Sequence, residues 1–209
     1  MANQAGPVCR LCRREGVKLY LKGAKCVTKC VFEKRNQVLP GQHGMARRRK
    51  VSDYGIQLRA KQRARRMYGV LERQFRGYFS DAERSPGVTG TVLLQQLERR
   101  LDNIVYRLGF AASRREARQL VSHRHFAVNG RTLNIPSAQL RPGDVVEIRS
   151  GSREIQPIQM AADMRKDRSV PDWLTLDAAS SKGSVVRLPE RQEMELVIDE
   201  QLIVEYYSR

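Results

Sequence analysis

The 209-residue sequence predicts an α+β protein made of a metal-binding head, an arginine-rich helical domain and a compact domain of helices on a small, mostly antiparallel sheet. Three observations predict this class. Four cysteines fall within the first 30 residues, arginines recur at helical spacing after residue 46, and a helix, a hairpin and an alternating strand follow one another between residues 99 and 149. A chain of this length holds one good core with an appendage, or two modest domains.

Charge is distributed very unevenly along the chain. Residues 1–79 contain 20 Lys and Arg against 4 Asp and Glu, whereas residues 80–209 contain 19 against 18. Such asymmetry is typical of a segment embedded in nucleic acid and joined to an ordinary globule. No apolar run approaches the roughly 20 residues of a membrane span, and the first ten residues lack the apolar core of a secretory signal. We therefore expect a cytoplasmic protein with a polyanionic partner and no membrane partner.

The cysteines form two close pairs, Cys9-x2-Cys12 and Cys26-x3-Cys30, separated by thirteen residues. Two such pairs can surround one tetrahedral ion, and in a reducing compartment a cluster of this kind favours metal binding over disulfides. Residues 1–45 would form this metal-binding head with its glycine loop. The roughly 30 residues around the cysteines contain few large apolar side chains, so the metal would supply the folding energy. We expect one structural Zn²⁺, with a 4Fe-4S cluster on the same thiolates as the rival and four unrelated thiols as the remaining alternative.

Residues 46–90 are predicted to form a basic helical domain, joined by the C-terminal residues 199–209. After the glycine loop at residues 40–45, Ser52 or Asp53 can cap a helix that runs to about Tyr78, with a potential break at Gly69. Seven residues share its apolar face: Ile56, Ala60, Ala64, Met67, Leu71, Phe75 and Tyr78. Arg59, Arg63, Arg66 and Arg73 form a stripe about a quarter-turn away. With almost no acids to offset their repulsion, this stripe favours phosphate binding over a solvated face.

Residues 91–198 are predicted to form the third domain. One helix should run from about Thr91 to Gly109, and Ser113-Arg-Arg-Glu116 is a capping box that opens a shorter helix. Arginines 114, 115 and 118 surround the first turn of that helix, where we expect them to be exposed and to bind phosphate. Asn129-Gly130 predicts a hairpin with a type I′ turn, followed by a strand at residues 145–149.

The remaining features are less informative. None of the three histidines has the partners that catalysis requires; His43 is expected to contact RNA or pack, and His123 and His125 are either RNA contacts or half-buried hairpin residues. Residues 196–198 suggest a strand and the tail a short helix. Six acids between residues 190 and 205 suggest a protein partner, and residues 150–183 indicate no function. We predict no catalytic residues.

Four sequence segments carry a family resemblance: Arg99-Arg-Leu-Asp-Asn103, Ser113-Arg-Arg-Glu-Ala-Arg118, His125-Phe-Ala-Val-Asn-Gly130 and Pro142-Gly-Asp144. Together they closely resemble the S-four RNA-binding domain over about residues 99–149. That module also occurs in tyrosyl-tRNA synthetases, pseudouridine synthases, and heat-shock and rescue proteins. The cysteine-rich head, the Pro40-Gly-Gln-His-Gly44 loop and the ending Gln201 to Arg209 extend the resemblance to the S-four family of small-subunit ribosomal proteins. The family pattern has four residues inside the second cysteine pair, and this chain has three.

This resemblance implies a structural role in the ribosome. Such a protein binds early to a five-way junction in the 5′ domain of small-subunit rRNA, nucleates assembly, influences decoding accuracy and in some bacteria represses its own messenger. Neighbouring small-subunit proteins, and mRNA near the channel through which it enters, are the other implied partners. The basic residues that we expect to bind RNA are Arg47, Arg48, Arg49, Lys50, Arg59, Lys61, Arg63, Arg65, Arg66, Arg73, Arg76, Arg114, Arg115, Arg118, His123, Arg124 and Arg131.

Two other classes compete with this interpretation. An enzyme that modifies or charges RNA would need a further catalytic domain of roughly 100 to 200 residues, with a nucleotide-binding or nucleophile signature. The sequence contains no such signature, and we expect neither an enzyme nor a small-molecule substrate. A zinc protein that binds DNA is disfavoured because no recognition helix follows the cysteines before the glycine loop.

Overall fold

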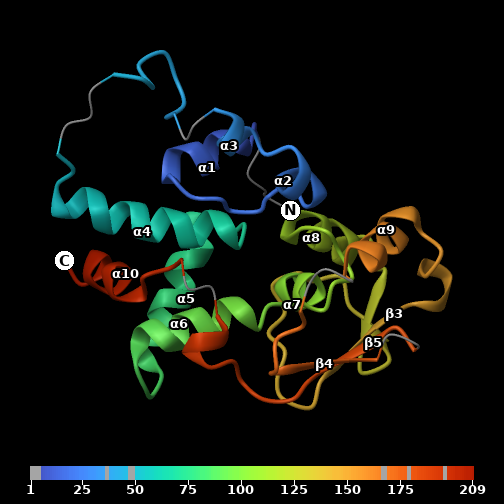
Figure 1. Cartoon of the computed structure of the whole chain (residues 1–209). Helices are drawn as coiled ribbons and strands as arrows, with labels where there is room; N and C mark the ends of the chain where they lie inside the picture. The colour runs from blue at the N-terminus through green and yellow to red at the C-terminus, as the bar shows by residue number, and fades with distance from the viewer. Residues whose placement is uncertain (1–5, 36–37, 47–49, 166–168, 178–179, 195–196) are drawn as a thin grey trace. The chain divides into compact units, whose positions relative to one another are not determined.

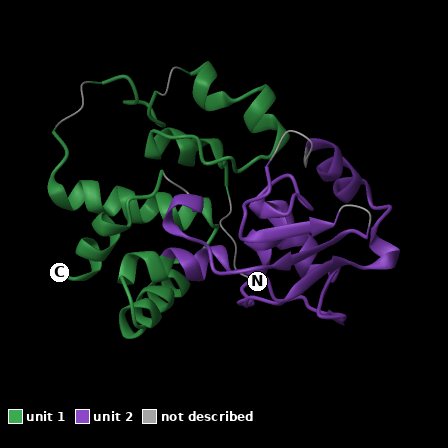
Figure 2. Cartoon of the chain, turned by 60° about the horizontal axis from the view of Figure 1, so that its bottom comes forward, with its two compact units in different colours: residues 1–93, 196–209 green, residues 94–195 purple. Residues whose placement is uncertain are grey.

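The computed structural model of the chain describes residues 6–35, 38–46, 50–165, 169–177, 180–194 and 197–209 (Figure 1). The chain forms two compact units, one of residues 1–93 and 196–209 and the other of residues 94–195 (Figure 2). Within the described residues, no helix combines the length and the apolar character that crossing a membrane requires.

The first unit is helical. Its helices are α1 (Cys9–Glu15), α2 (Ala24–Thr28), α3 (Val31–Lys34), α4 (Asp53–Met67), α5 (Glu72–Arg84), the beginning of α6 (Thr89–Glu98) and α10 (Glu200–Tyr207). Ser52 caps α4 by accepting a hydrogen bond from the backbone N–H of Gly55 at 3.3 Å, which confirms one of the two predicted caps. The long basic helix is broken as expected, because Gly69 adopts a left-handed φ of +64° between α4 and α5.

Most residues of the predicted apolar face of α4 and α5 are buried. Ala60, Ala64, Met67 and Phe75 are buried, whereas Ile56 is 44% exposed. The C-terminal helix α10 lies alongside α4 (Figure 1) and is capped by Asp199, which confirms the predicted terminal helix.

Aromatic packing fixes the C-terminal helix to α5. The ring of Tyr207 stacks on Phe79 with 4.5 Å between centroids, and the Tyr207 hydroxyl donates to Glu72 Oε1 at 3.0 Å. The tail is therefore part of this unit's core.

The second unit packs helices on an antiparallel sheet. The second unit contains the end of α6 and three further helices: α7 (Leu101–Arg107), α8 (Arg114–Ser122) and α9 (Gln156–Arg165). It also has the short 3-10 turns η1 (Ser150–Ser152) and η2 (Arg191–Glu193). Its strands are β1 (Phe126–Val128), β2 (Arg131–Thr132), β3 (Val145–Ile148), β4 (Leu174–Asp177) and β5 (Lys182–Val185). The sheet order is β2-β1-β3-β5-β4, and every pairing is antiparallel, in agreement with the predicted mostly antiparallel sheet.

The prediction of a single helix from Thr91 to Gly109 is wrong. The first helix ends at Glu98 and a second one begins at Leu101, because Arg100 is extended and forms a β-bridge with Gln139. The apolar spacing continued across this break and concealed it. Gly109 does stop α7, with a left-handed φ of +77°.

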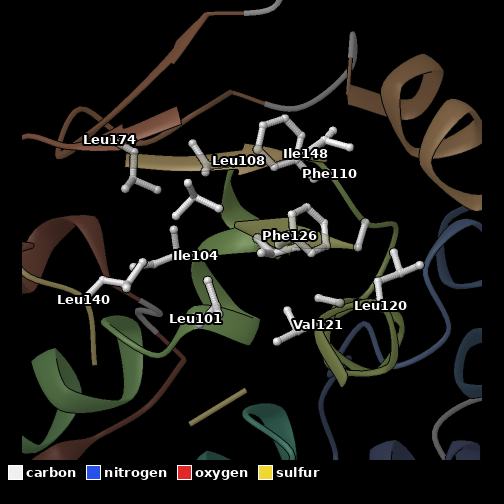
Figure 3. Packing of buried hydrophobic residues seen from close by; sticks show 14 of the residues in the cluster. Leu101, Ile104, Leu108, Phe110, Leu120, Val121, Phe126, Leu140, Ile148 and Leu174 are labelled. Atoms are coloured by element: carbon white, nitrogen blue, oxygen red, sulfur yellow. The ribbon is translucent and has the colours of Figure 1, made fainter. Parts of the chain in front are cut away.

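The hairpin turn has the predicted form. Asn129 and Gly130 have φ values of +50° and +76°, which is the type I′ geometry that matches strand twist. The core below it contains Leu101, Ile104 and Leu108 of α7, Val121 of α8 and Phe126 of β1 (Figure 3).

Residues 150–183, from which no function could be predicted, supply strand β4 and the first half of β5. Trp173 in this segment is fully buried in the core cluster. The strand expected at residues 196–198 is wrong for its described part, because Val197 and Ile198 belong to no strand.

Candidate nucleic-acid interface

The four cysteines line one cavity of about 300 Å³ in the head. Cys9 and Cys12 lie on α1, Cys26 lies on α2 and Cys30 immediately precedes α3. The backbone N–H of Lys22 donates to Cys26 Sγ at 3.2 Å. Burial raises the pKa of the Cys12 and Cys26 thiols, with the other cysteines adding to the effect.

The donor set fits a soft metal, since four thiols facing one cavity are the ligands that Zn²⁺ and iron-sulfur clusters take. Among the described residues, however, no three Cys, His, Asp or Glu side chains already lie close enough together to hold an ion. The metal site remains a prediction.

The end of α1 that follows the cysteines places an acid among the arginines of α4. Glu15 Oε1 accepts hydrogen bonds from Arg59 Nη1 at 3.0 Å and from Arg66 Nη1, and the Glu15 side chain has no exposed surface. Burial raises the pKa of Glu15, and the attraction of Arg59 and Arg66 opposes that rise. Two members of the predicted phosphate-binding stripe therefore have an internal partner, although both side chains keep part of their surface exposed.

Two other cations of α4 also have internal partners. Lys61 is buried, and its Nζ lies 2.5 Å from Glu72 Oε1 and 4.5 Å from the centre of the Tyr206 ring. Arg63 Nη1 donates to the backbone carbonyl of Val197 at 3.1 Å. Lys61 thus lacks the exposed charge that an RNA contact requires, because its ammonium group is buried against Glu72 and the tyrosine rings of the C-terminal helix.

The other basic residues of this unit that we expected to bind RNA differ in their environments. Arg65 donates to Gln62 Oε1 at 3.0 Å and lies 3.5 Å from Glu72. Lys50, Arg73 and Arg76 are exposed and form no ion pair with another described residue. Arginines 47, 48 and 49, also expected to bind RNA, lie outside the described residues.

In the second unit the predicted capping box holds α8, with one change of partner. Ser113 Oγ accepts from the backbone N–H of Glu116 at 3.3 Å, while Glu116 Oε2 accepts from Ala112 N–H at 2.7 Å rather than from Ser113. This reciprocal arrangement fixes the first turn, where Arg115 is exposed and Arg118 half-buried.

The expectation that Arg114 is exposed is wrong. Arg114 is buried, its Nε donates to Asn103 Oδ1 at 2.7 Å, and its guanidinium lies 4.6 Å from the centre of the Tyr106 ring. Asn103 in turn donates to Glu98, which also accepts two hydrogen bonds from Arg107. Arg114 therefore links α8 to α7 through a buried polar network.

A second buried acid orients the neighbouring arginines. Arg100 is fully buried and donates to both carboxylate oxygens of Asp102 at 2.9 and 2.6 Å, and Arg118 Nη1 lies 3.4 Å from Asp102 Oδ2. Sequence reasoning missed this pair. Residues two apart do not face each other within a helix, so the Arg-Leu-Asp spacing predicts no contact. Arg100 reaches Asp102 because its backbone is extended.

Further cations lie at the end of α8 and on the hairpin that follows it. His123, Arg124 and Arg131 are exposed, as an RNA-binding role requires. Arg124 has a left-handed φ of +65°, and its carbonyl accepts from Arg149 Nη1 at 3.1 Å. The sequence prediction omitted Arg149, although that residue ends the predicted strand.

Comparison with known proteins agrees with this architecture. Residues 3–98 match the family model described as "Ribosomal protein S4/S9 N-terminal domain", and residues 99–146 match the model described as "S4 domain". The chain is 61% identical to small ribosomal subunit protein uS4A of Symbiobacterium thermophilum. It is 56% and 55% identical to the uS4 proteins of Acidobacterium capsulatum and Natranaerobius thermophilus. In each case the match covers 100% of both chains. With two family models adjoining at residue 98 and relatives this similar along their whole length, the chain belongs to the uS4 family of small ribosomal subunit proteins.

Proposed function

We propose that this protein is a structural constituent of the small ribosomal subunit, that it binds small-subunit rRNA directly, and that it acts in the cytoplasm with the ribosome. The uS4 proteins are structural ribosomal proteins and not a family of enzymes. Full-length identity of 55–61% to three of them supports the same role here.

One observation carries the RNA-binding part of the proposal. Among the described residues one acid of the first unit and two of the second are buried, while arginines remain exposed in both units. The buried acids accept hydrogen bonds from neighbouring arginines; they are Glu15, Glu98 and Asp102. Five of the exposed arginines that we expected to bind RNA form no ion pair with other described residues; they are Arg73, Arg76, Arg115, Arg124 and Arg131. A surface whose cations lack local counter-charges attracts phosphate, and each neutralised phosphate releases counterions.

The finer role follows from the family resemblance. We propose that the target is a multi-helix junction of the rRNA, that binding nucleates assembly of the subunit body, and that the protein affects translational accuracy. Neighbouring small-subunit proteins would cover part of the remaining surface, and mRNA would pass nearby. Arginine suits such a junction because its planar fork contacts phosphates in pairs and stacks on bases.

We also propose that Cys9, Cys12, Cys26 and Cys30 hold one structural Zn²⁺, with a 4Fe-4S cluster as the alternative. The shared cavity and the N–H donated to Cys26 support this assignment. A tetrathiolate ion would cross-link three short helices, each of at most seven residues, that have little apolar core of their own.

Sedimentation of tagged protein from cells tests the proposed function. The protein should migrate with the small subunit at physiological salt and leave it together with rRNA fragments after partial nuclease digestion. Migration with free protein under the same conditions, or release that does not depend on intact rRNA, would refute the proposal.

A further inference from the structure

A small cavity in the second unit opens between α9 and the sheet. It has a volume of about 130 Å³ and is lined by Gly109, Phe110, Ile148, Arg153, Ile158, Gln159, Ala162 and Ser181. Because one water takes about 30 Å³ in the liquid, the cavity has room for roughly four waters. It is far below the 300 Å³ or more of a pocket for a drug-sized ligand. Its size suits one flat ring.

The walls of this cavity are apolar and fixed. Phe110, Ile148 and Ile158 are buried, and Phe110 packs on Phe126 with 6.1 Å between ring centroids (Figure 3). A ring that enters would displace water from apolar surface and meet an aromatic side chain held by its neighbours.

The open side of the cavity is polar and cationic. Arg153 is exposed, and its Nη2 reaches the carbonyl of Ser180 at only 3.4 Å, a long hydrogen bond that leaves the guanidinium free to swing over an occupant. Gln159, also exposed, supplies an amide that can donate to or accept from a base edge. An aliphatic side chain would use neither group.

Further cations adjoin the same rim through the chain from Ile148 to Arg153. Arg149 is anchored by the Arg124 carbonyl, and its own backbone N–H donates to the His125 carbonyl at 3.1 Å. Arg124, Arg149 and Arg153 form no ion pair with any acid of the described residues; neighbouring Glu154 is exposed and pairs with none of them. The guanidinium groups of Arg149 and Arg153 are thus held by neutral carbonyls, which orient them without offsetting their charge.

We infer that this cavity binds the base of one unpaired RNA nucleotide, with Arg153 stacked over the ring and Arg124 and Arg149 holding adjacent phosphates. The inference rests on the proposed RNA-binding function and adds a site to it. Unpaired bases of folded RNA are commonly recognised by stacking on aromatic rings and guanidinium planes, while flanking phosphates are held by cations. Charge complementarity selects RNA over an apolar side chain of a neighbouring protein as the occupant.

Two variants of the full-length protein separate the base site from its phosphate contacts. Ala162→Leu fills the cavity from α9 without changing charge, and Arg124→Gln with Arg149→Gln removes two cations without touching the cavity lining. Met160→Leu is the matched control, because Met160 lies on the same helix, is 58% exposed and does not line the cavity. Thermal unfolding of each variant checks that the fold is retained.

The probes are a nine-nucleotide oligouridine strand and an abasic strand with the same number of phosphates, measured by fluorescence anisotropy at one salt concentration. Wild type and Met160→Leu should prefer oligouridine about fivefold or more, which is the scale of one stacked base. Ala162→Leu should lose that preference and bind the abasic strand like wild type. The arginine double variant should weaken both probes by the same factor.

Equal affinity of wild type for the two probes, or an unchanged preference in Ala162→Leu, would overturn the inference. A photocross-link in the wild-type complex avoids mutation altogether: 4-thiouridine in the strand should attach to one of the residues that line the cavity. Attachment only elsewhere would also overturn it. Binding of wild type to small-subunit rRNA is measured in parallel. If the wild-type protein does not bind the rRNA, the proposed function is refuted. If it binds the rRNA but does not prefer oligouridine over the abasic strand, only this base site is refuted.

Discussion

Arg59 Nη1 lies 3.0 Å from Glu15 Oε1, so a cation of the basic helix is held by a carboxylate with no exposed surface. Glu15 lies one helical turn beyond Cys12 on α1, which makes α1 the connection between the cysteine cavity and α4. Whatever orders the cysteines thereby also positions Arg59 and Arg66. Unlike a surface ion pair, a buried one of this kind is sensitive to removal of either partner.

Replacing Glu15 with Ala should destabilise the first unit by about 2–3 kcal/mol. A fully buried pair that loses one partner costs about 3–5 kcal/mol, and the partial exposure of both arginines reduces that figure. Urea unfolding followed by the fluorescence of the tyrosines on α4 and α10 measures the change. Glu15→Gln, which keeps an acceptor, should lose less. Equal stability of Glu15→Ala and wild type would show that this carboxylate does not hold α1 on α4.

Removing the carboxylate of Asp102 should destabilise the second unit more severely. Asp102→Ala removes the two hydrogen bonds that this carboxylate accepts from the fully buried guanidinium of Arg100, and we expect a loss of about 3–5 kcal/mol. Asp163→Ala is the control, since that side chain is exposed on α9. Urea unfolding followed through Trp173 fluorescence should separate the two variants clearly. A similar small loss in both would mean that Arg100 finds another partner when Asp102 is removed.

Acid should weaken the second unit through His125. Burial, with help from His123 and Arg149, lowers the pKa of His125 below its usual value near 6.5. The unfolded chain then binds the proton more readily, so stability is retained above about pH 6.5 and falls as the pH drops through the lowered pKa. The effect should be below about 1 kcal/mol, because the side chain is only partly buried. His125→Gln should show a smaller loss between pH 7.5 and 5. Parallel pH profiles for the two proteins would exclude His125 as the source.

Chelation should act mainly on the first 40 residues. If the cysteines hold Zn²⁺ or an iron-sulfur cluster, the purified protein should contain about one equivalent of it, and removal should make residues 1–40 sensitive to protease while the sheet stays resistant. Cys12→Ser should mimic removal, whereas Thr28→Ser, an exposed change on α2, should not. Protease resistance of the head after complete metal removal would contradict the assignment.

Sequence reasoning succeeded where local chemistry decides the structure. The Ser113 cap, the Asn129-Gly130 turn and the stop at Gly109 each depend on a few neighbouring residues. It failed where distant residues decide. The break at Arg100 depends on a bridge to Gln139, and the burial of Lys61 depends on Glu72 and the C-terminal helix. Similarly, the periodicity of the arginines could not reveal that Glu15 pairs with Arg59 and Arg66, because Glu15 lies on another helix.

Binding to folded rRNA tests the central claim most directly. The affinity of the full-length protein is measured for two RNAs over a range of salt concentrations. One is a small-subunit rRNA fragment that contains a multi-helix junction, and the other is a strand of equal length and scrambled sequence. We predict tighter binding to the junction at every salt concentration. Arg115→Gln with Arg118→Gln should reduce binding to the junction more than binding to the scrambled strand, because phosphates in a folded junction have fixed positions. Equal affinity for both RNAs across the salt range would contradict the account, because it would leave only a general attraction between a basic protein and a polyanion.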